Sequence, residues 1–175
     1  MGAYFEKVSR FADIDISLPV RATANSAGYD LAAAESIDIP PLSKILDTKV
    51  GKDWIEDLDS VEKWIKQFNF RPTLVSTGLK CHLDPGTYLE LSARSSTPLK
   101  YLLVLANGVG VIDADYYNNP NNEGEIFLQF INLSPMTIHI KKGDKLGQGI
   151  IKPYLVVEND NATGERQGGF GSTSK

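Results

Sequence analysis

The fold of this chain is decided by the stretch Ala106-Asn107-Gly108-Val109-Gly110-Val111-Ile112-Asp113-Ala114-Asp115-Tyr116. Val, Ile and Tyr favour strands, and glycines let the backbone bend or approach a ligand closely. The pattern predicts a β-hairpin that offers its peptide N–H and C=O groups to a flat, planar ligand. The same residues also fit a strand that ends in a solvated acidic turn, which is the more common structure around a single Asp-x-Asp. The rest of the chain must decide between these two interpretations.

The composition is typical of a globular protein with one domain. The chain has 175 residues, 42% of them hydrophobic and 23% charged, which is long enough to bury one core. The formal net charge of −4 argues against a protein that binds nucleic acid through its overall charge. A single cysteine, Cys81, excludes an internal disulfide and gives no sign of an oxidising compartment. Because the sequence contains no run of about 18 apolar residues, we expect no membrane span and a cytoplasmic location.

Short stretches of alternating apolar residues, separated by turns, run along most of the chain. Met136, Ile138 and Ile140 alternate strictly with polar residues, which predicts a half-exposed strand. Turn residues stand at 84–86 and 142–144. Further strands are expected within 3–20, 37–39, 74–80, 88–91, 126–131 and 146–151. Short strands with frequent turns predict an all-β protein, an antiparallel sandwich or jelly roll formed by a single domain over residues 1–163.

Residues 47–70 interrupt this β pattern. Four apolar residues fall at the helical spacing i, i+3, i+4 and i+7, namely Val61, Trp64, Ile65 and Phe68. Asp59 with Glu62 three residues later resembles a capping box, so we expect one inserted α-helix around 57–69. Its apolar stripe would pack on the core of its own chain or, as the second interpretation, bind a partner protein.

Two polar segments carry groups suited to anionic ligands. Arg94 stands beside the hydroxyls of Ser95 and Ser96. A guanidinium fork and short hydroxyl donors suit phosphate oxygens, although an ordinary Ser/Thr-rich loop has the same composition. The glycine-rich tail 164–175 contains a lone Phe170. This tail is either disordered or a flexible arm with one flat side chain for stacking and several donors for anionic oxygens.

Five short motifs, taken in order, resemble those of the trimeric deoxyuridine triphosphatase (dUTPase) family. They are Ala27–Leu31, Ala93–Ser96, Gly110–Tyr116, Gly143–Gln148 and Arg166–Thr173. The resemblance covers most of the chain apart from 47–70. The chain departs from the family's usual pattern at Lys145, where an arginine is common, and in the loop Tyr117–Glu123, which lengthens a turn that is usually very short.

The resemblance implies a β jelly roll (β-clip) that forms a homotrimer, with active sites that draw residues from all three subunits. It also implies hydrolysis of dUTP to dUMP and pyrophosphate with Mg²⁺ on the triphosphate. This reaction limits uracil incorporation into DNA and supplies dUMP for dTMP synthesis. Phosphoryl transfer depends mainly on positioning and charge neutralisation, which fits a site made of donors and one Mg²⁺. Residues 164–175 would be the flexible arm that closes this site.

The resemblance further implies a role for each motif residue. Asp113 would be the general base that orients the attacking water, and Tyr116 would lie against the deoxyribose and leave no room for a 2′-hydroxyl. Asp30 would hold a magnesium-bound water, although its local sequence taken alone favours a turn residue that caps its own backbone. The uracil would be recognised by Asn107, Gly110 and Ile112, with Phe170 stacked on it. The residues expected at the phosphates are Arg94, Ser95, Ser96, Gln148, Arg166, Gly171, Ser172 and Thr173.

Two alternative functions remain open at the level of sequence. The first is a dCTP deaminase, alone or combined with dUTPase activity, which the Arg94–Ser96 run would suit. The second is a regulatory protein on the same scaffold that binds a partner through the 47–70 helix. The exposure of Trp54, Trp64, Ile65 and Phe68 would discriminate the second alternative from a helix that is simply part of the fold.

Overall fold

The computed structural model describes residues 2–42, 71–164, 166, 168 and 169. Strands dominate this part of the chain, which confirms the all-β prediction. They are β1 (Tyr4–Lys7), β2 (Tyr29–Ala32), β3 (Ile37–Ile39), β4 (Thr73–Ser76), β5 (Leu79–His82), β6 (Thr87–Ala93), β7 (Leu103–Leu105), β8 (Gly110–Asp113), β9 (Phe127–Asn132), β10 (Ile138–Ile140) and β11 (Lys145–Pro153). The short helices are η1 (Ser9–Phe11), α3 (Ser96–Tyr101) and η2 (Ala114–Tyr116). The helix expected around 57–69 lies outside the described residues.

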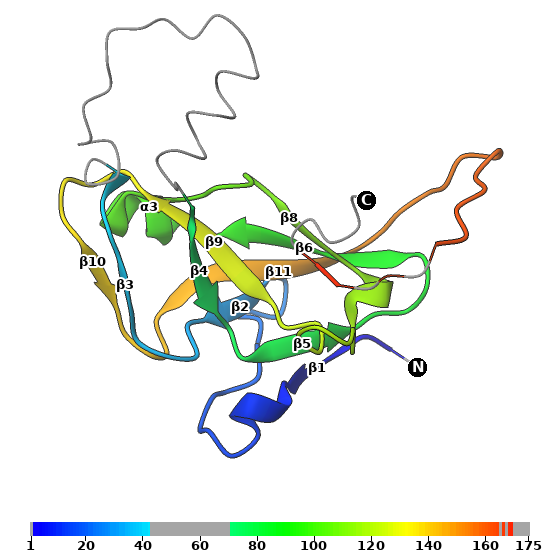
Figure 1. Ribbon diagram of the computed structural model, residues 1–175, viewed down its shortest axis with the longest axis horizontal. Helices are drawn as coiled ribbons and strands as arrows, with labels where there is room; N and C mark the ends of the chain where they lie inside the picture. Colours follow the sequence, from blue (N-terminus) through cyan, green and yellow to red (C-terminus); the bar gives the residue numbers. More distant parts are fainter. Residues whose placement is uncertain (1, 43–70, 165, 167, 170–175) are drawn as a thin grey trace, which may run out of the picture.

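Two antiparallel sheets form the body of the molecule (Figure 1). One has the strand order β2-β11-β6-β8 and the other has the order β4-β9-β7, while β1 pairs with β5 and β10 pairs with β3. Leu31 and Leu89 of the first sheet share one buried cluster with Leu128 and Phe130 of the second. All four side chains are at most 1% exposed, so the core lies between the two sheets.

The stretch 106–116 is not the β-hairpin that its sequence suggests, and that expectation is wrong. β7 pairs with β9 in one sheet, whereas β8 pairs with β6 in the other. The Ala106 N–H still donates to the carbonyl of Gln129 on β9, at 2.9 Å. The chain then turns at Gly108 (φ +66°) and enters the second sheet at Gly110. The stretch therefore connects the two sheets instead of folding back on itself.

Two further segments differ from the sequence expectation. The N-terminal strand ends at Lys7, and η1 follows it. The 3₁₀ turn places Val8 and Phe11 on the same side of the segment, where both side chains are buried. Residues 96–101, within and beyond the expected Ser/Thr-rich loop, form the helix α3. The hydroxyl of Thr97 in this helix is buried and donates to the carbonyl of Leu146 at 2.7 Å, which fixes α3 against β11.

The free thiol of Cys81 lies deep in this core. It is 1% exposed on β5, opposite Phe5 of β1, and burial raises its pKa to about 12. Because the thiolate is the reactive form, we expect a disulfide reagent at pH 8 to leave the native protein unlabelled and to titrate one thiol per chain after denaturation. Rapid labelling of the native protein would contradict this prediction and would mean that β1 and β5 separate easily.

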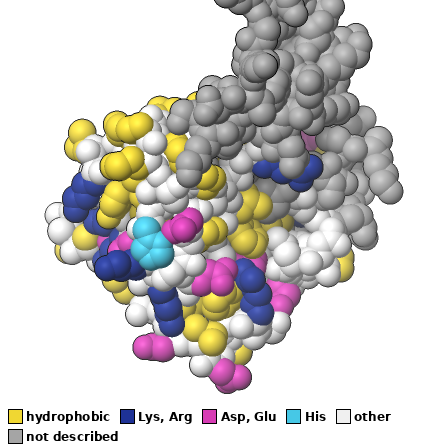
Figure 2. Space-filling model, turned by 60° about the vertical axis from the view of Figure 1, so that its left-hand side comes forward, with side chains coloured by type: hydrophobic (Ala, Val, Ile, Leu, Met, Phe, Trp, Pro, Cys, Tyr) yellow, Lys and Arg dark blue, Asp and Glu magenta, His cyan; other side chains and the backbone are white. Residues whose placement is uncertain are grey.

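The surface gives no sign of one dominant charge on the face that Figure 2 displays. There, Lys and Arg side chains alternate with Asp and Glu side chains and with small hydrophobic areas. Among the described residues, no helix combines the length and the apolar character that crossing a membrane requires.

Candidate functional site

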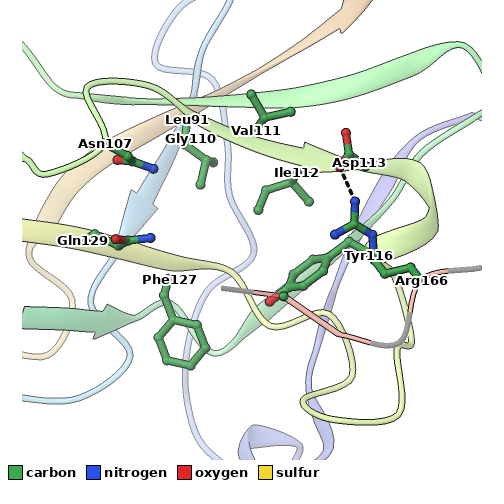
Figure 3. Close-up of a pocket in the computed structure, with 11 residues that line it drawn as sticks. Leu91, Asn107, Gly110, Val111, Ile112, Asp113, Tyr116, Phe127, Gln129 and Arg166 are labelled. Atoms are coloured by element: carbon green, nitrogen blue, oxygen red, sulfur yellow. Dashed lines mark hydrogen bonds and ion pairs between the residues drawn. The ribbon is translucent and has the colours of Figure 1, made fainter. Parts of the chain in front are cut away.

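A pocket of about 170 Å³ lies at the end of β8, beside η2 (Figure 3). Six residues singled out in the sequence line it, which are Asn107, Gly110, Ile112, Asp113, Tyr116 and Arg166. The structure thus brings together the residues expected at the uracil, the sugar and the attacking water. The solvated-turn interpretation of the two aspartates does not account for this pocket.

Three neighbouring elements position these side chains. β8 runs antiparallel to β6, with Gly110 opposite Leu91 and Asp113 opposite Tyr88. A β-carbon on Gly110 would lie 3.0 Å from the β-carbon of Leu91, so the glycine lets the two strands pack this closely. The chain turns into η2 directly after Asp113, and this turn places Tyr116 in the wall of the same pocket.

The guanidinium of Arg166 lies between the two carboxylates of the motif. It donates to Asp113 through Nη2 and to Asp115 through Nε, the latter at 2.6 Å. The side chain of Arg166 is only 19% exposed, whereas those of Asp113 and Asp115 are 48% and 58% exposed. The structure therefore sets a cation from the start of the tail against the expected general base, within the same chain.

Tyr116 forms a rigid wall of the pocket. Tyr116 is 4% exposed. Burial raises the pKa of its phenol above the ordinary value, so the hydroxyl is protonated at neutral pH. A β-carbon on Gly169 would lie 2.6 Å from Cε2 of the ring. Only a glycine can therefore lie this close to the ring at position 169.

Five further residues that line this pocket are not among the candidate site residues predicted from the sequence. They are Leu91, Val111, Phe127, Gln129 and Gly169. Phe127 and Gln129 alternate on β9 with the buried Leu128 and Phe130, so they project from the opposite face of that strand. The sequence shows this alternation, but it gives no sign that one face of the strand is exposed, because both faces carry apolar residues. The second face is instead partly exposed because it borders the pocket.

A second cluster lies on β2 and β11 and at the end of β6, and it consists of Asp30, Arg94, Lys145 and Gln148. Asp30 Oδ1 lies 3.0 Å from Arg94 Nε, and Asp30 Oδ2 lies 3.0 Å from Lys145 Nζ. Gln148 is opposite Asp30 in the register of β11 and β2. A β-carbon on Gly28 would lie 2.4 Å from the Gln148 side-chain oxygen. The first, second and fourth motifs thus meet at one place in the fold.

The hydroxyls expected at the phosphates lie beside this second cluster. Ser95 precedes α3 and is exposed, and Ser96 begins the helix and is partly exposed. Among the described residues, neither hydroxyl makes a hydrogen bond. The four tail residues expected at the nucleotide, Phe170, Gly171, Ser172 and Thr173, lie outside the described residues.

Asp113 of the pocket and Arg94 of the second cluster lie at opposite ends of β6. Asp113 is opposite Tyr88, near the start of this strand, whereas Arg94 directly follows its end. Six residues of extended chain separate Tyr88 from Arg94, which corresponds to about 20 Å. A nucleotide with its α-phosphate at Asp113 therefore cannot contact Arg94 of the same chain.

The side chain of Asp30 also stabilises the fold through its two ion pairs, because it is only 10% exposed. We expect Asp30→Asn to lower the free energy of unfolding by about 1.5–3 kcal/mol, since Arg94 and Lys145 lose a charged acceptor and then repel each other. Urea denaturation at pH 7 measures this change. The matched control is Asp38→Asn, because Asp38 pairs with His139 on the surface, with side chains 64% and 63% exposed. The control variant should change stability by less than about 1 kcal/mol, and equal effects of the two substitutions would contradict the prediction.

Comparisons with known proteins agree with this geometry. The model of the dUTPase family matches residues 49–174. The deoxyuridine 5′-triphosphate nucleotidohydrolase of Lactococcus lactis subsp. lactis is 40% identical over 171 residues, covering 97% of this chain and 95% of that protein. The protein of the same name from Wolinella succinogenes is 31% identical over 163 residues, covering 90% and 87%.

Solved structures give the same result. The crystal structure of dUTPase from Streptococcus mutans matches with a TM-score of 0.70 and 37% identity, covering 91% of this chain and all of that one. The dUTPase from phage phi11 of S. aureus, at 19% identity and a TM-score of 0.63, shares the fold. These matches do not favour the dCTP deaminase or the regulatory alternative. The chain therefore belongs to the dUTPase family, whose reaction is the hydrolysis of dUTP to dUMP and pyrophosphate.

Proposed function

We propose that Asp113 is the general base of this hydrolysis and that each active site is completed by other copies of the chain in a homotrimer. The observation that carries this proposal is the separation of Asp113 from Arg94, which is about 20 Å along β6. Asp113 lies in a pocket with Tyr116 and the uracil-binding candidates, whereas Arg94 and Gln148 lie at the far end of the sheet.

Within the pocket, the residue types fit the separate tasks of the reaction. The backbone near Gly110 and Ile112, with the side chain of Asn107, would recognise the edge of uracil. Asp113 would accept a proton from a water molecule as its oxygen attacks the α-phosphorus, and the bond to the pyrophosphate leaving group would break. A positioned carboxylate base contributes about 10²–10⁴-fold to such a rate.

The second cluster would supply the phosphate contacts from a neighbouring subunit. Arg94, Ser95, Ser96 and Gln148 offer N–H and O–H donors suited to phosphate oxygens. Arg166 would contact the terminal phosphate, which requires that its guanidinium leave Asp113 and Asp115. Phe170, Gly171, Ser172 and Thr173 would complete the closing arm over residues 164–175, as the motif order implies.

Magnesium fits this site as an ion carried by the triphosphate. Among the described residues, no group of three or more His, Cys, Asp or Glu side chains could hold a metal ion, and both oxygens of Asp30 already accept from Arg94 and Lys145. Mg²⁺ prefers phosphate oxygens and water, so Asp30 would contact it only through a bound water. When bound, the ion would neutralise charge on the phosphates.

Exposed apolar residues after β11 support assembly with other copies. Residues 154–164, drawn in orange in Figure 1, leave the sheet before the chain returns at Arg166. Leu155 is 98% exposed, and its neighbours Val156 and Val157 are 67% and 69% exposed. Consecutive exposed apolar residues are typical of an interface, and an extended segment of this kind suits contact with a neighbouring subunit.

Mixing two inactive variants tests the shared site directly. Asp113→Asn and Arg94→Ala chains would be denatured together in equal amounts, refolded, and assayed for pyrophosphate release from dUTP with Mg²⁺ present or absent. If each site takes Asp113 and Arg94 from different chains, about a quarter of the sites in a random mixture contain both residues and activity returns. If both residues act within one chain, no mixed site is complete.

Three controls make the result decisive. Each variant refolded alone must remain inactive, light scattering must give three chains per particle, and a panel of nucleoside triphosphates must show preference for dUTP. Activity that stays absent in a trimeric mixture would overturn the shared site. The domain boundary at 163 and the cytoplasmic location stay predictions, as does a protein partner at 47–70.

A further inference from the structure

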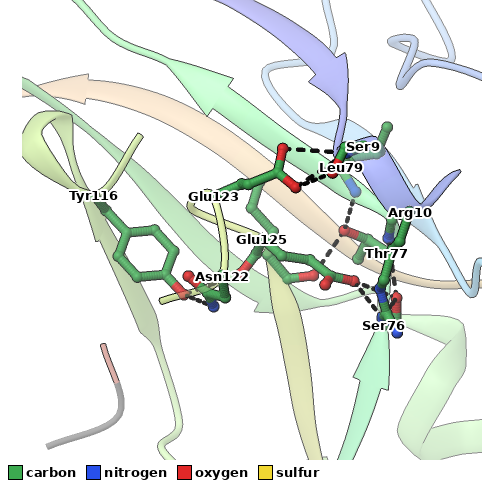
Figure 4. Close-up of polar contacts among 11 residues, drawn as sticks. Ser9, Arg10, Ser76, Thr77, Leu79, Tyr116, Asn122, Glu123 and Glu125 are labelled. Atoms are coloured by element: carbon green, nitrogen blue, oxygen red, sulfur yellow. Dashed lines mark hydrogen bonds and ion pairs between the residues drawn. The ribbon is translucent and has the colours of Figure 1, made fainter. Parts of the chain in front are cut away.

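The phenol of Tyr116 is held from two sides by the loop that follows it. Asn122 Nδ2 donates to the phenol oxygen at 2.8 Å, and the phenol hydroxyl donates to the backbone carbonyl of Glu125 at 3.0 Å (Figure 4). The hydroxyl has one proton to give, and that proton is used inside the fold. The ring itself, and not the hydroxyl, is therefore the surface that Tyr116 offers to the pocket.

Asn122 is fixed by the same loop. Its Oδ1 accepts from Asn119 Nδ2 at 2.8 Å and from the Gly124 N–H at 3.2 Å. Asn119 is 5% exposed and also donates to the carbonyl of Tyr116 at 2.9 Å. Gly124 has φ +81°, and a β-carbon there would lie 2.5 Å from the Tyr116 carbonyl oxygen. The loop is thus closed over the tyrosine backbone and presents the Asn122 amide at one defined position.

The backbone carbonyl of Glu125, which accepts the phenol proton, is fixed as well. The side chain of Glu125 is 5% exposed, and its carboxylate accepts from Arg10 Nη2 at 2.8 Å and from Ser76 Oγ at 2.5 Å. The next residue, Ile126, donates its N–H to the carbonyl of Leu79 on β5 at 2.8 Å. These bonds tie the segment of Glu125 and Ile126 to η1, β4 and β5. The Glu125 carbonyl, which accepts the phenol proton, is therefore held in place by the body of the fold and not by the loop alone.

We infer that Asn122 is a positioning residue for sugar specificity, which holds the Tyr116 ring where it excludes a ribose 2′-hydroxyl. This inference rests on the proposed role of Tyr116 against the deoxyribose. Gly169 touches one side of the ring, so displacement of the ring is limited on that side and is controlled mainly by the two hydrogen bonds at the hydroxyl. If the bond from Asn122 is lost, the ring can tilt and open space for one oxygen atom.

A double-mutant cycle with dUTP and UTP as substrates tests this inference. The readout is the ratio of kcat/KM for dUTP to kcat/KM for UTP, measured for wild type, Asn122→Ala, Tyr116→Phe and the double variant. We expect each single substitution to lower the ratio by about tenfold. The double variant should match Tyr116→Phe, because Tyr116→Phe already lacks the bond from Asn122 as well as the bond to the Glu125 carbonyl. The matched control is Asn121→Ala, which alters an exposed asparagine of the same loop and should leave the ratio unchanged.

The outcomes separate the possible explanations. An Asn122→Ala ratio equal to wild type, or single effects that multiply in the double variant, would overturn the inference. Melting curves report folding, and if Asn122→Ala does not fold, Asn122→Asp replaces it, because the carboxylate keeps an acceptor for Asn119 and Gly124 and lacks the N–H that donates to the phenol. An unchanged ratio in Tyr116→Ala would show instead that the proposed role of Tyr116 is wrong.

Discussion

Asp113→Asn should lower kcat for dUTP by about 10²–10⁴-fold, because the amide cannot accept the proton of the attacking water. Binding of the nucleotide should change little, since asparagine has the same shape and Asp113 is one of several residues that line the pocket. Steady-state kinetics gives kcat, and calorimetry with a non-hydrolysable deoxyuridine nucleotide gives the dissociation constant.

The matched control for this substitution is Asp115→Asn. Asp115 also pairs with Arg166 but is 58% exposed and does not line the pocket. This variant should keep most of its turnover, so a difference between the two variants isolates the role of the base from the loss of an ion pair. Wild-type turnover in Asp113→Asn would contradict the assignment.

Deletion of residues 164–175 should lower kcat/KM for dUTP by about 10²-fold or more, because a site left open loses both phosphate contacts and the exclusion of water. The melting temperature should change little. In the described part of the tail, Arg166 donates to Asp113 and Asp115, and Gly169 lies against Tyr116. Arg166 and Gly169 both line the pocket. Kinetics and melting curves on the same preparation provide the comparison.

Arg166→Ala is the control that separates the contribution of Arg166 from that of the rest of the tail. If the single substitution gives only part of the loss, the rest of the tail contributes contacts of its own, as expected from Phe170 and the residues after it. Kinetics unchanged by the deletion would show that the tail has no part in the reaction.

The sequence by itself determined most strands and turns and the identity of most candidate residues. Alternation at 138–140 corresponds to the strand β10, although Met136, which belongs to the same pattern, precedes the strand and is 68% exposed. The turns at 84–86 and 142–144 have glycines with φ of +83° and +89°. These features depend on neighbouring residues alone, because side-chain alternation and turn conformation are local properties. The motif order likewise identified the family.

Only the tertiary structure decided which strands pair and which residues share a site. The stretch 106–116 has the composition of a hairpin, yet β8 pairs with β6 and β7 pairs with β9. This pairing brings Phe127 and Gln129 into the Asp113 pocket and leaves Asp30 and Arg94 at the other end of the sheet. The bond from Asn122 to Tyr116 depends on a loop closed by Gly124. A two-residue period specifies a strand but not its partner, because pairing is selected by contacts between residues far apart in the chain.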